Sequence, residues 1–476
     1  MELCPGSAER HLIPDLQPVP ALEYHRLTVH RPGHPPVDDP RILHGFRPML
    51  WDLKPPQFKT YPGHDAIALP DSIGAGPELD LAAVGRILFL SGGVVRVMQA
   101  GGAPMWFRAA GSAGNLSPIE LYLVTGDIAG LAAGVYHYEP VEHALTRLAD
   151  VPARTSPALV LTGVPWRTSW KYRERGFRHL WWDAGTMLAQ TLAVAEEAGW
   201  PARVELGFVD SQVAALVGGD GRREMPLAVV GLGGPVELPP VAASLPPAGF
   251  LAPDFVEFPL VTAAYRAGEL ATSADVDAWR ERAGAYDAAA TSDYDDWTPP
   301  CRLDEVIRRR GSTREFLIDD VPPPDLVTGA MGWATRPVPA DFVAPGRTLL
   351  EHRLIILTGK DENTRAAARH LCLDQPLGGD GAYTVFHCAG LAQITTAIGD
   401  RGYRAALLEA GIVEGRLHLA AYSLGYGATG LTFYDDEVKR FFDMRADPML
   451  VTAVGRPTYR SRPGGLPRRP VRMVPS

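Results

Sequence analysis

The chain repeats part of its own sequence at the scale of a domain. Residues 175–213 and residues 401–438 carry the same pattern of arginine, glycine, phenylalanine and aspartate. The residues that recur in the second copy are Arg175, Gly176, Arg178, Ala184, Gly185, Gly199, Phe208, Asp210 and Val213. The offset is 226 residues, from Gly185 to Gly411, and it slips by one near the end of the repeat. Such a repeat predicts two copies of one fold, joined head to tail and packed on each other as a homodimer would be.

The composition leaves room for two domains and excludes several classes of protein. A chain of 476 residues can bury two separate cores. The formal net charge of −9 argues against a nucleic-acid partner, because phosphate contacts need clustered Lys and Arg. The four cysteines show no CxxC spacing, which favours a reducing cytoplasm. The first residues lack a signal-peptide pattern, and no apolar run approaches the ~20 residues that span a bilayer. We therefore expect a cytoplasmic protein without a membrane partner.

Helix and strand patterns divide the chain into four segments. Residues 1–63, rich in proline and histidine, are predicted to form an N-terminal arm that wraps over a partner domain. Residues 64–234 are predicted to be the first domain, and residues 235–300 a linker that holds one helix. The second domain, residues 301–476, is expected to start with a helix that Asp304 caps. Helices and strands mix without strict βαβ alternation, so each half is predicted to be α+β.

The sharpest local motif is RRRGSTREF at residues 308–316. Arginine makes bidentate contacts to phosphate, and serine or backbone N–H groups in a turn add neutral donors. Arginines at a helix end also occur because they oppose the negative end of the helix dipole. The spacing by itself leaves a phosphate site and a solvated helix end equally open.

This motif resembles the opening RRSxRxF motif of the nitroreductase superfamily, with Gly311 as a one-residue insertion. Residues 319–335 also resemble the usual continuation of that family. The sequence FRAAGSAGNLSPIELYLV at residues 107–124 is similar to the family's PSAGxLYPVELYLV segment, with Gly111 and Ser117 in place of proline and tyrosine. The resemblance implies two tandem nitroreductase-like, FMN-binding domains packed as an intramolecular pseudo-dimer.

Three further segments resemble one branch of that superfamily, the SagB-type dehydrogenases. They are YHRLTVH at residues 24–30, GLAAGVYHYEPVEHALTRL at residues 130–148 and WKYRERGFRHLWWDAG at residues 170–185. That branch contains the flavin-dependent oxidases that convert azolines to azoles in ribosomal peptide natural products. The resemblance implies an FMN-dependent dehydrogenase that acts on a modified peptide or another small-molecule intermediate, with other biosynthetic enzymes as partners and oxygen as electron acceptor.

The resemblance also implies one composite FMN site per chain, because the two halves carry complementary motifs. The second half matches the family's phosphate, ribityl and ring contacts at Arg309, Arg310, Ser312, Arg314, Gly430, Leu431 and Arg456. The first half matches the family's opposing loop at Ser112, Ala113, Gly114 and Asn115. It has no basic loop of its own, and Leu232 stands where Arg456 would be. The second, pseudo-symmetric site is therefore expected to be empty or vestigial.

Lys171 and Tyr172 are the candidate catalytic residues, because azoline oxidases carry a catalytic Lys-Tyr pair at this place. A buried lysine can act as a base, and a tyrosine hydroxyl can relay or donate a proton. A lysine and a tyrosine on an amphipathic helix also occur often without any such role. The aligned positions in the second half are Ala397 and Ile398, so one copy alone is equipped.

No metal site is predicted. His25, His30 and His34 lie close together but have no cysteine partners, and structural use is the better hypothesis. The GxGxxG pattern at residues 425–430 follows a predicted helix and leads into a strand. This order is the reverse of that in a dinucleotide fingerprint, so we reject that interpretation.

Two alternative functions remain open at this point. The first is an NAD(P)H-driven reductase of nitro or quinone compounds, which would not need the Lys-Tyr pair. The second is a flavin-free scaffold in a biosynthetic complex, which the incomplete first half and the departures at Gly111 and Ser117 favour. A monomer is expected in every case, because the two-fold interface of the fold is already intramolecular.

Overall fold

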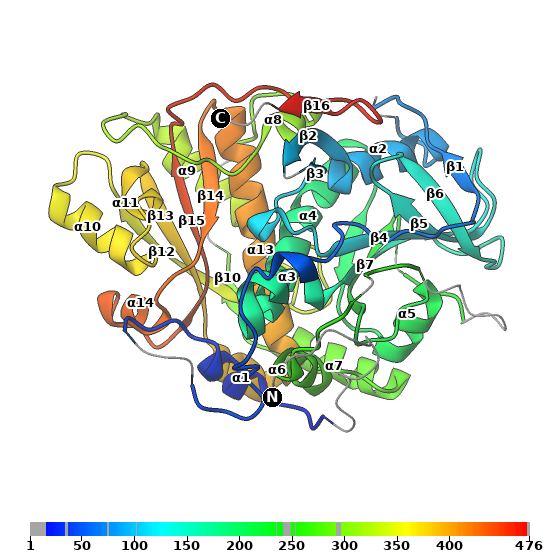
Figure 1. Ribbon diagram of the computed structural model, residues 1–476, viewed down its shortest axis with the longest axis horizontal. Coiled ribbons are helices and arrows are strands. Elements are labelled where there is room, and N and C mark those ends of the chain that lie inside the picture. Colours follow the sequence, from blue (N-terminus) through cyan, green and yellow to red (C-terminus); the bar gives the residue numbers. More distant parts are fainter. Residues whose placement is uncertain are drawn as a thin grey trace.

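The computed structural model describes residues 16–33, 37–73, 76–100, 102–234, 236–240, 249–252, 254–291 and 297–473. These residues form two α+β units that lie side by side, with the long helices α4 (Gly176–Glu197) and α13 (Arg401–Ser423) between them (Figure 1). The two helices are the two copies of the sequence repeat.

The first unit is built on a seven-stranded antiparallel sheet with the strand order β1-β6-β5-β4-β7-β9-β8. Its strands are β1 (Ala66–Ala68), β4 (Ile119–Thr125), β5 (Gly134–Glu139), β6 (Ala144–Ala149), β7 (Ala158–Gly163), β8 (Ala202–Glu205) and β9 (Met225–Leu232). The unit also contains α2 (Leu81–Gly92), α3 (Pro165–Tyr172), α5 (Asp210–Val217) and a hairpin of β2 (Val94–Ala100) and β3 (Ala103–Arg108). Every residue of β4, β7 and β9 is buried, because α4 covers one face of the sheet and α5 packs on the other.

The second unit repeats this plan on a smaller sheet of four antiparallel strands in the order β12-β13-β15-β14. The strands are β12 (Leu350–Ile356), β13 (Tyr383–Ala389), β14 (Gly427–Leu431) and β15 (Asp447–Gly455). The helices are α8 (Leu303–Arg309), α9 (Pro324–Ala334), α10 (Glu362–Leu371), α11 (Leu377–Asp380), α12 (Leu391–Ile398) and α14 (Asp435–Phe441). The order β13, α12, α13, β14, α14, β15 matches the order β7, α3, α4, β8, α5, β9 of the first unit.

The two long helices approach each other most closely at a pair of glycines. A Cβ atom on Gly411 would lie 2.5 Å from the carbonyl oxygen of Trp182 and 3.0 Å from the Cα of Gly185. Gly185 and Gly411 occupy the same position in the repeat, so an approximate two-fold axis passes between them. The predicted α+β pseudo-dimer of two repeated domains is confirmed.

The same two-fold relation holds for the charged residues of the repeat. Arg175 and Arg178 bind Asp435 of the second unit, and Arg401 and Arg404 bind Asp210 of the first. The four N–O distances are 3.1, 2.8, 2.6 and 3.0 Å, and all six side chains are buried. Burial alone would raise the pKa of Asp435, but its two arginine partners hold that pKa below the ordinary value. Each unit therefore supplies the counter-charge of the other.

Replacing Asp435 by alanine should destabilise the junction between the units strongly. The change leaves Arg175 and Arg178 buried without their carboxylate, which costs about 3–5 kcal/mol. We expect the midpoint of thermal unfolding to fall by about 3–5 °C. The neighbouring change Asp436→Ala is the control, because that carboxylate forms a half-exposed pair with Arg31 and contributes about 1 kcal/mol or less. Equal midpoints for the two variants would contradict this assignment.

The stability from Asp435 also has a defined pH dependence. A carboxyl group whose pKa is lowered by folding stabilises the protein above its unfolded pKa of about 3.9. This contribution is lost as the pH falls through the lowered folded value. The difference in unfolding midpoint between the native chain and Asp435→Ala should therefore be constant near neutral pH and shrink below about pH 4.

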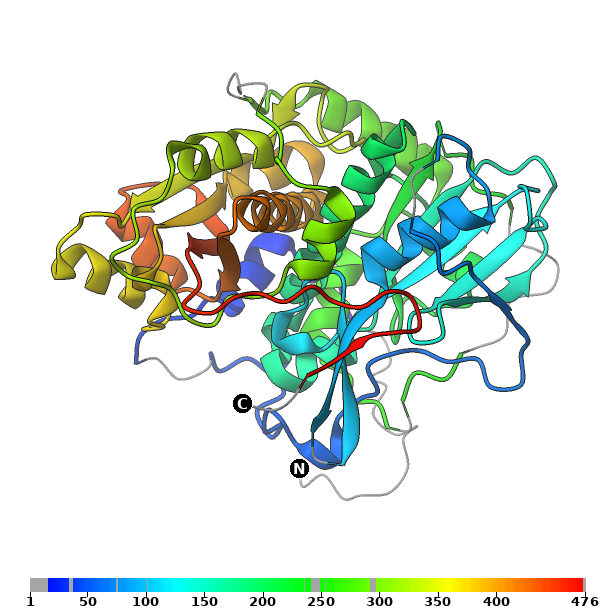
Figure 2. The same cartoon turned by 90° about the horizontal axis from the view of Figure 1, so that it is seen from above.

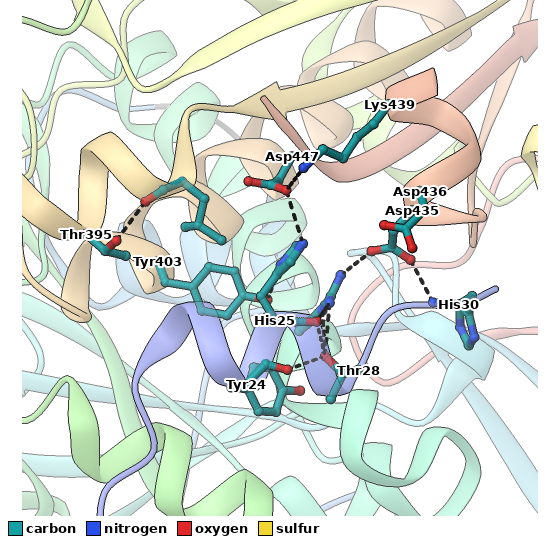
Figure 3. A network of polar contacts seen from close by, with 12 residues as sticks. Tyr24, His25, Thr28, His30, Thr395, Tyr403, Asp435, Asp436, Lys439 and Asp447 are labelled. Carbon is teal, nitrogen blue, oxygen red and sulfur yellow. Dashed lines mark hydrogen bonds and ion pairs between the residues drawn. The ribbon is translucent and has the colours of Figure 1, made fainter. Parts of the chain in front are cut away.

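The N-terminal arm covers this junction between the units. Helix α1 (Ala21–Leu27) lies over it, and His25 Nδ1 is 3.2 Å from the hydroxyl of Tyr403 (Figure 3). The backbone N–H of His30 donates to Asp435 Oδ2 at 2.9 Å. The arm thus binds residues of the second unit, and His25 and His30 take part in this packing, whereas His34 lies outside the described residues.

The segment between the units, residues 235–300, holds more structure than the sequence indicates. Besides the expected helix, α7 (Ser273–Ala285), it contains α6 (Pro259–Ala267). The indole N–H of Trp279 in α7 donates to the carbonyl of Ile398 in the second unit at 3.0 Å. The short strand β10 (Ala289–Ala290) pairs with β11 (Arg347–Thr348).

The end of the chain crosses from the second unit back to the first. Figure 2 shows the C-terminal segment running over the molecule to the hairpin of β2 and β3. There β16 (Val471–Met473) pairs in parallel with β2. A strand from the second unit therefore completes a small sheet on the first.

The expected cap at Asp304 is wrong. Helix α8 begins after Arg302, and no side chain caps its first turn. Asp304 lies inside that turn and binds the guanidinium groups of Arg302 at 3.2 Å and Arg308 at 3.4 Å. The basic residues nearby draw the carboxylate away from the backbone N–H groups.

Candidate functional site

The loop at residues 112–115 is held by the long helix of its own unit. Ser112 Oγ donates to Asp183 Oδ2 at 2.8 Å, and the backbone N–H of Ala113 donates to Asp183 Oδ1 at 3.0 Å. Gly114 is exposed and has a φ of +62°, a conformation that glycine adopts without strain. Asp183 thus fixes the loop from α4, a role that sequence reasoning missed.

The second unit contains the equivalent of this carboxylate. Glu409 lies 226 residues after Asp183. It accepts from the Thr348 hydroxyl at 2.7 Å and from the Leu349 backbone N–H at 2.9 Å. Burial raises the pKa of each carboxyl group to about 7. An acidic residue at the same position of both repeat helices was the signal that could have identified Asp183.

Lys171 and Tyr172 meet the loop at its exposed glycine. They end helix α3, and a Cβ atom on Gly114 would lie 3.1 Å from Lys171 Nζ and 3.0 Å from Tyr172 Oη. Burial, together with the positive charge of Arg314, lowers the pKa of Lys171. Burial, together with the negative charge of Asp183, raises the pKa of Tyr172. The amine of Lys171, which loses its proton more easily than an ordinary lysine, and the protonated phenol of Tyr172 therefore both face Gly114.

His179 supports Tyr172 from behind. The two rings stack with centroids 3.8 Å apart and planes 21° from parallel. Among the residues that the structure describes, neither ring nitrogen of His179 has a hydrogen-bond partner. Burial and the charge of Arg175 hold the pKa of His179 well below its ordinary value, so the imidazole is neutral. Sequence reasoning gave no sign of this residue.

The motif at residues 308–316, here called the basic loop, reaches across from the second unit to the first through Arg310. Its guanidinium is buried, and Nε donates to the carbonyl of Ala109. A Cβ atom on Gly111 would lie 3.1 Å from Arg310 Nη1, so proline, the usual family residue at that position, would press on the guanidinium. Burial lowers the pKa of Arg310 to about 10, which leaves it charged at neutral pH. Arg309 is half-buried and Arg314 is exposed.

The basic loop also lies along the free edge of β14. Ser312 forms a parallel bridge with Ala428, and the Thr313 backbone N–H donates to the Ala428 carbonyl at 3.0 Å. Backbone groups alternate in direction along a strand, so those of Gly430 point outward like those of Ala428. A Cβ atom on Gly430 would overlap the carboxylate of Glu414. Gly430 thus keeps an exposed backbone edge beside the basic loop, and Leu431 follows it as a buried side chain.

Arg456 and Asn115 already form polar contacts with other residues of the chain. Arg456 Nε binds Asp320 Oδ1 at 2.5 Å, and Nη2 donates to Tyr426 Oη at 2.8 Å. Asn115 Nδ2 donates to the carbonyl of Trp106 at 2.9 Å. Arg456 stays a predicted phosphate contact, but its guanidinium would have to share donors with Asp320.

The two-fold relation gives the first unit a counterpart of this candidate site, at the edge of β8. Residues 339–341 of the same chain cover that counterpart. In strand register, Val204 of β8 corresponds to Ala428 of β14, because they pair with Val230 and Val454, two residues before Leu232 and Arg456, and Leu206 takes the place of Gly430. The backbone N–H of Val204 donates to the carbonyl of Pro339 at 2.8 Å, and its carbonyl accepts from the Asp341 N–H at 3.1 Å. The carboxylate of Asp341 accepts from the Leu206 N–H at 2.8 Å. The strand edge that is open in the second unit is therefore covered in the first.

Two further features distinguish the candidate site at β14 from its counterpart at β8. Arg280 of α7 binds Glu205 at 2.7 Å and Asp341 at 3.2 Å, which locks the covering segment to the end of β8. The repeat positions of the Lys-Tyr pair carry Ala397 and Ile398, so no proton-transfer group stands there. Of these two sites, the candidate site at β14, which we call the open site, combines a basic loop, an exposed strand edge and titratable side chains.

The charged and backbone groups of the open site fit FMN. Arg309, Arg310 and Arg314 supply positive charge for a phosphate, and the exposed backbone edge at Gly430 can face a planar ring system. Among the described residues no group of three or more His, Cys, Asp or Glu side chains could hold a metal ion. In the same part of the chain, no helix is long and apolar enough to cross a membrane.

No family model matches the chain, but two curated proteins are similar in sequence. The chain is 32% identical over 138 residues to the microcin B17-processing protein McbC of Escherichia coli, which covers 25% of this chain and 51% of McbC. It is 25% identical over 146 residues to a protein of Methanocaldococcus jannaschii that bears the name of a nitroreductase, which covers 28% of this chain and 72% of that protein. The chain thus spans about half the length of McbC.

One solved structure matches nearly the whole chain. It comes from Anabaena variabilis and is described as a nitroreductase, with a TM-score of 0.71 and 22% sequence identity. The match covers 92% of this chain and 99% of that one. Both units of the pseudo-dimer therefore recur in a known fold, and the fold class expected from the sequence motifs is confirmed.

Proposed function

We propose that this chain, a member of the nitroreductase superfamily related to the SagB-type azoline oxidases, is an FMN-dependent dehydrogenase with one composite site. The observation that carries this proposal is the meeting of complementary parts from both units. Lys171 and Tyr172 of the first unit face the loop at Gly114, while Arg310 of the second unit lies against Gly111 of that same loop.

The basic loop and the β14 edge would hold the cofactor. Arg309, Arg310, Ser312 and Arg314 are assigned to the phosphate and ribityl chain, with Arg456 as a further phosphate contact. Gly430 and Leu431 are assigned to the ring, because their strand edge is open. On the other side, Ser112, Ala113, Gly114 and Asn115 supply the opposing loop, which Asp183 keeps in place.

The chemistry divides between the cofactor and the protein. When bound, FMN supplies a two-electron acceptor for a hydride from a substrate carbon. Lys171 Nζ takes up the proton that leaves the substrate, since its lowered pKa makes the neutral amine more available. Tyr172 stays protonated and orients the substrate through its hydroxyl, and His179 holds the phenol ring by stacking.

The substrate we propose is an azoline ring in a modified peptide or a related natural-product intermediate. The support is the sequence similarity to McbC, whose name describes it as processing microcin B17. Loss of a hydride and a proton from such a ring gives the aromatic azole, with oxygen as the final electron acceptor. Other enzymes of the same biosynthetic route are the expected partners.

Counting flavin tests this proposal first. The visible spectrum of the purified protein, with flavin released by denaturation, should give close to one FMN per chain, because the second place is covered by residues 339–341. Two FMN per chain would contradict the closure of that place. A protein that binds none, even after FMN is added, would be a scaffold and not an enzyme of this kind.

A further inference from the structure

A separate cavity of about 560 Å³ lies between the hairpin of the first unit and the C-terminal tail. Its floor is one face of the three-stranded sheet β16-β2-β3, where Arg472, Val97 and Trp106 lie side by side in register. The remaining lining residues are Gln99, Val141, Glu142, Arg468, Arg469, Pro470 and Met473. We call this cavity the tail groove. Its volume is within the range of small-ligand sites.

The tail that builds the groove is strongly basic although the whole chain is acidic. Residues 456–473 contain six arginines and neither aspartate nor glutamate, whereas the chain has a net charge of −9. Three of these arginines line the groove. Arg468 Nε is paired with Asp71 at 2.9 Å, Arg469 Nη2 lies 3.9 Å from the same carboxylate, and Glu142 also lines the groove. The three arginines outnumber these two carboxylates, and the side chain of Arg469 is 78% exposed. The groove is therefore a local positive patch that attracts anionic groups.

The shape of the groove favours an extended ligand over a single anion. Two residues of mostly extended chain lie between Arg469 and Arg472, which places their Cα atoms about 10 Å apart, so their guanidinium groups suit two separate carboxylates. Between them the floor of Val97 and Trp106 offers apolar contact. Alternating charged and apolar contacts match the side chains of a polypeptide. Pro104 on the outer edge of β3 opposes strand addition, so the ligand crosses the face of the sheet.

One hydrogen bond links the floor of the tail groove to the loop of the candidate active site. The carbonyl of Trp106 in its floor accepts from Asn115 Nδ2 at 2.9 Å. Asn115 is the neighbour of Gly114, which contacts Lys171 and Tyr172. A polypeptide bound in the groove would thus lie on the same side of Trp106 as the loop that faces Lys171 and Tyr172, and a change at Asn115 would touch both.

From these observations we infer that the tail groove binds an acidic segment of a polypeptide. The arginines of the tail pair with its carboxylates, and Val97 and Trp106 contact the apolar side chains between them. This binding is independent of the flavin chemistry, so it is measured without turnover and holds or fails apart from the proposed function.

The test uses a fluorescein-labelled decapeptide in which glutamate alternates with leucine or alanine, and a second peptide with glutamine for glutamate. Fluorescence anisotropy should detect the acidic peptide and at least a tenfold weaker signal for the neutral one, with affinity falling as salt rises. The double variant Arg469→Gln/Arg472→Gln should weaken binding by roughly tenfold or more. Both side chains are exposed, and circular dichroism with the flavin count checks that the fold is retained.

A matched control removes the same charge from the same tail outside the groove. Arg460 and Arg462 are exposed and do not line the groove, so Arg460→Gln/Arg462→Gln should change the affinity by less than about twofold. An equal loss in both double variants would overturn the groove in favour of a diffuse charge effect. Equal binding of the two peptides, or tighter binding of inorganic tripolyphosphate than of the acidic peptide, would overturn the assignment to an acidic polypeptide.

Discussion

Purified protein carrying Arg309→Ala and Arg314→Ala together should contain no bound FMN. Both side chains lie on the basic loop beside the open edge of β14, and neither is buried, so the fold should survive their loss. A hydrogen bond to a charged phosphate contributes about 1.5–3 kcal/mol. Losing two such contacts should raise the Kd of FMN by roughly 10²- to 10⁴-fold. Titration of the flavin-free protein with FMN, followed by flavin fluorescence, measures this change.

Arg310 is the wrong residue for that experiment. Its buried guanidinium donates to the Ala109 carbonyl across the junction of the two units, so an alanine there would also unfold the junction. The control is Arg154→Ala with Arg282→Ala, two exposed arginines outside the basic loop, which should retain one FMN per chain. Normal flavin content in the Arg309 and Arg314 variant would refute the assignment of the phosphate site.

The substitution Lys171→Met should abolish most of the dehydrogenation rate and leave the flavin in place. General-base catalysis contributes about 10²- to 10⁴-fold, so kcat should fall by that amount. The side chain contacts the loop at Gly114 rather than the basic loop, so FMN content should not change. Steady-state oxidation of an azoline peptide, with flavin counted in the same sample, separates the two effects.

The dependence of the dehydrogenation rate on pH tests the role of Lys171 a second time. The base acts in its neutral form, so the rate should rise with pH up to the pKa of Lys171 and then level off. Because burial and Arg314 lower that pKa, the plateau should begin below the pH of about 10.4 at which an ordinary lysine titrates. The variant should lose this rise together with the rate.

The control for Lys171 is Lys360→Met, which removes an exposed lysine of the second unit and should change nothing. Tyr172→Phe keeps the stack on His179 while removing the hydroxyl, so it should lower kcat without loss of flavin. If Lys171→Met retained full activity and the protein reduced nitro or quinone compounds with NAD(P)H, the reductase alternative would replace the dehydrogenase.

The repeat in the sequence predicted that the two units pack on each other as a homodimer would, and the structure adds which residues meet. A two-fold axis places equivalent residues opposite one another, so positions at which both copies keep the same residue are candidates for the axis. Gly185 and Gly411 meet at the axis itself. The exchanged ion pairs, such as Arg178 with Asp435, follow from the same symmetry.

The residues that position the site were harder to predict. Asp183 holds the loop at residues 112–115 through two hydrogen bonds across about 70 residues of sequence. His179 supports Tyr172 by ring stacking, which has no sequence pattern. Helix α6 was missed because its short apolar pattern lies in a segment rich in proline. Local periodicity does not report contacts of this kind.

The sequence by itself determined the chemical groups of this protein and the elements that carry them. The arginines, the Lys-Tyr pair and the glycines follow from local motifs, and the repeat placed them in two related units. Only the tertiary structure decided that residues 339–341 cover the strand edge of the first unit while the edge at Gly430 stays open. It also decided that a basic tail returns to form a groove beside the first unit. Both outcomes depend on segments more than one hundred residues apart, whose packing is set by the whole fold rather than by their own sequence.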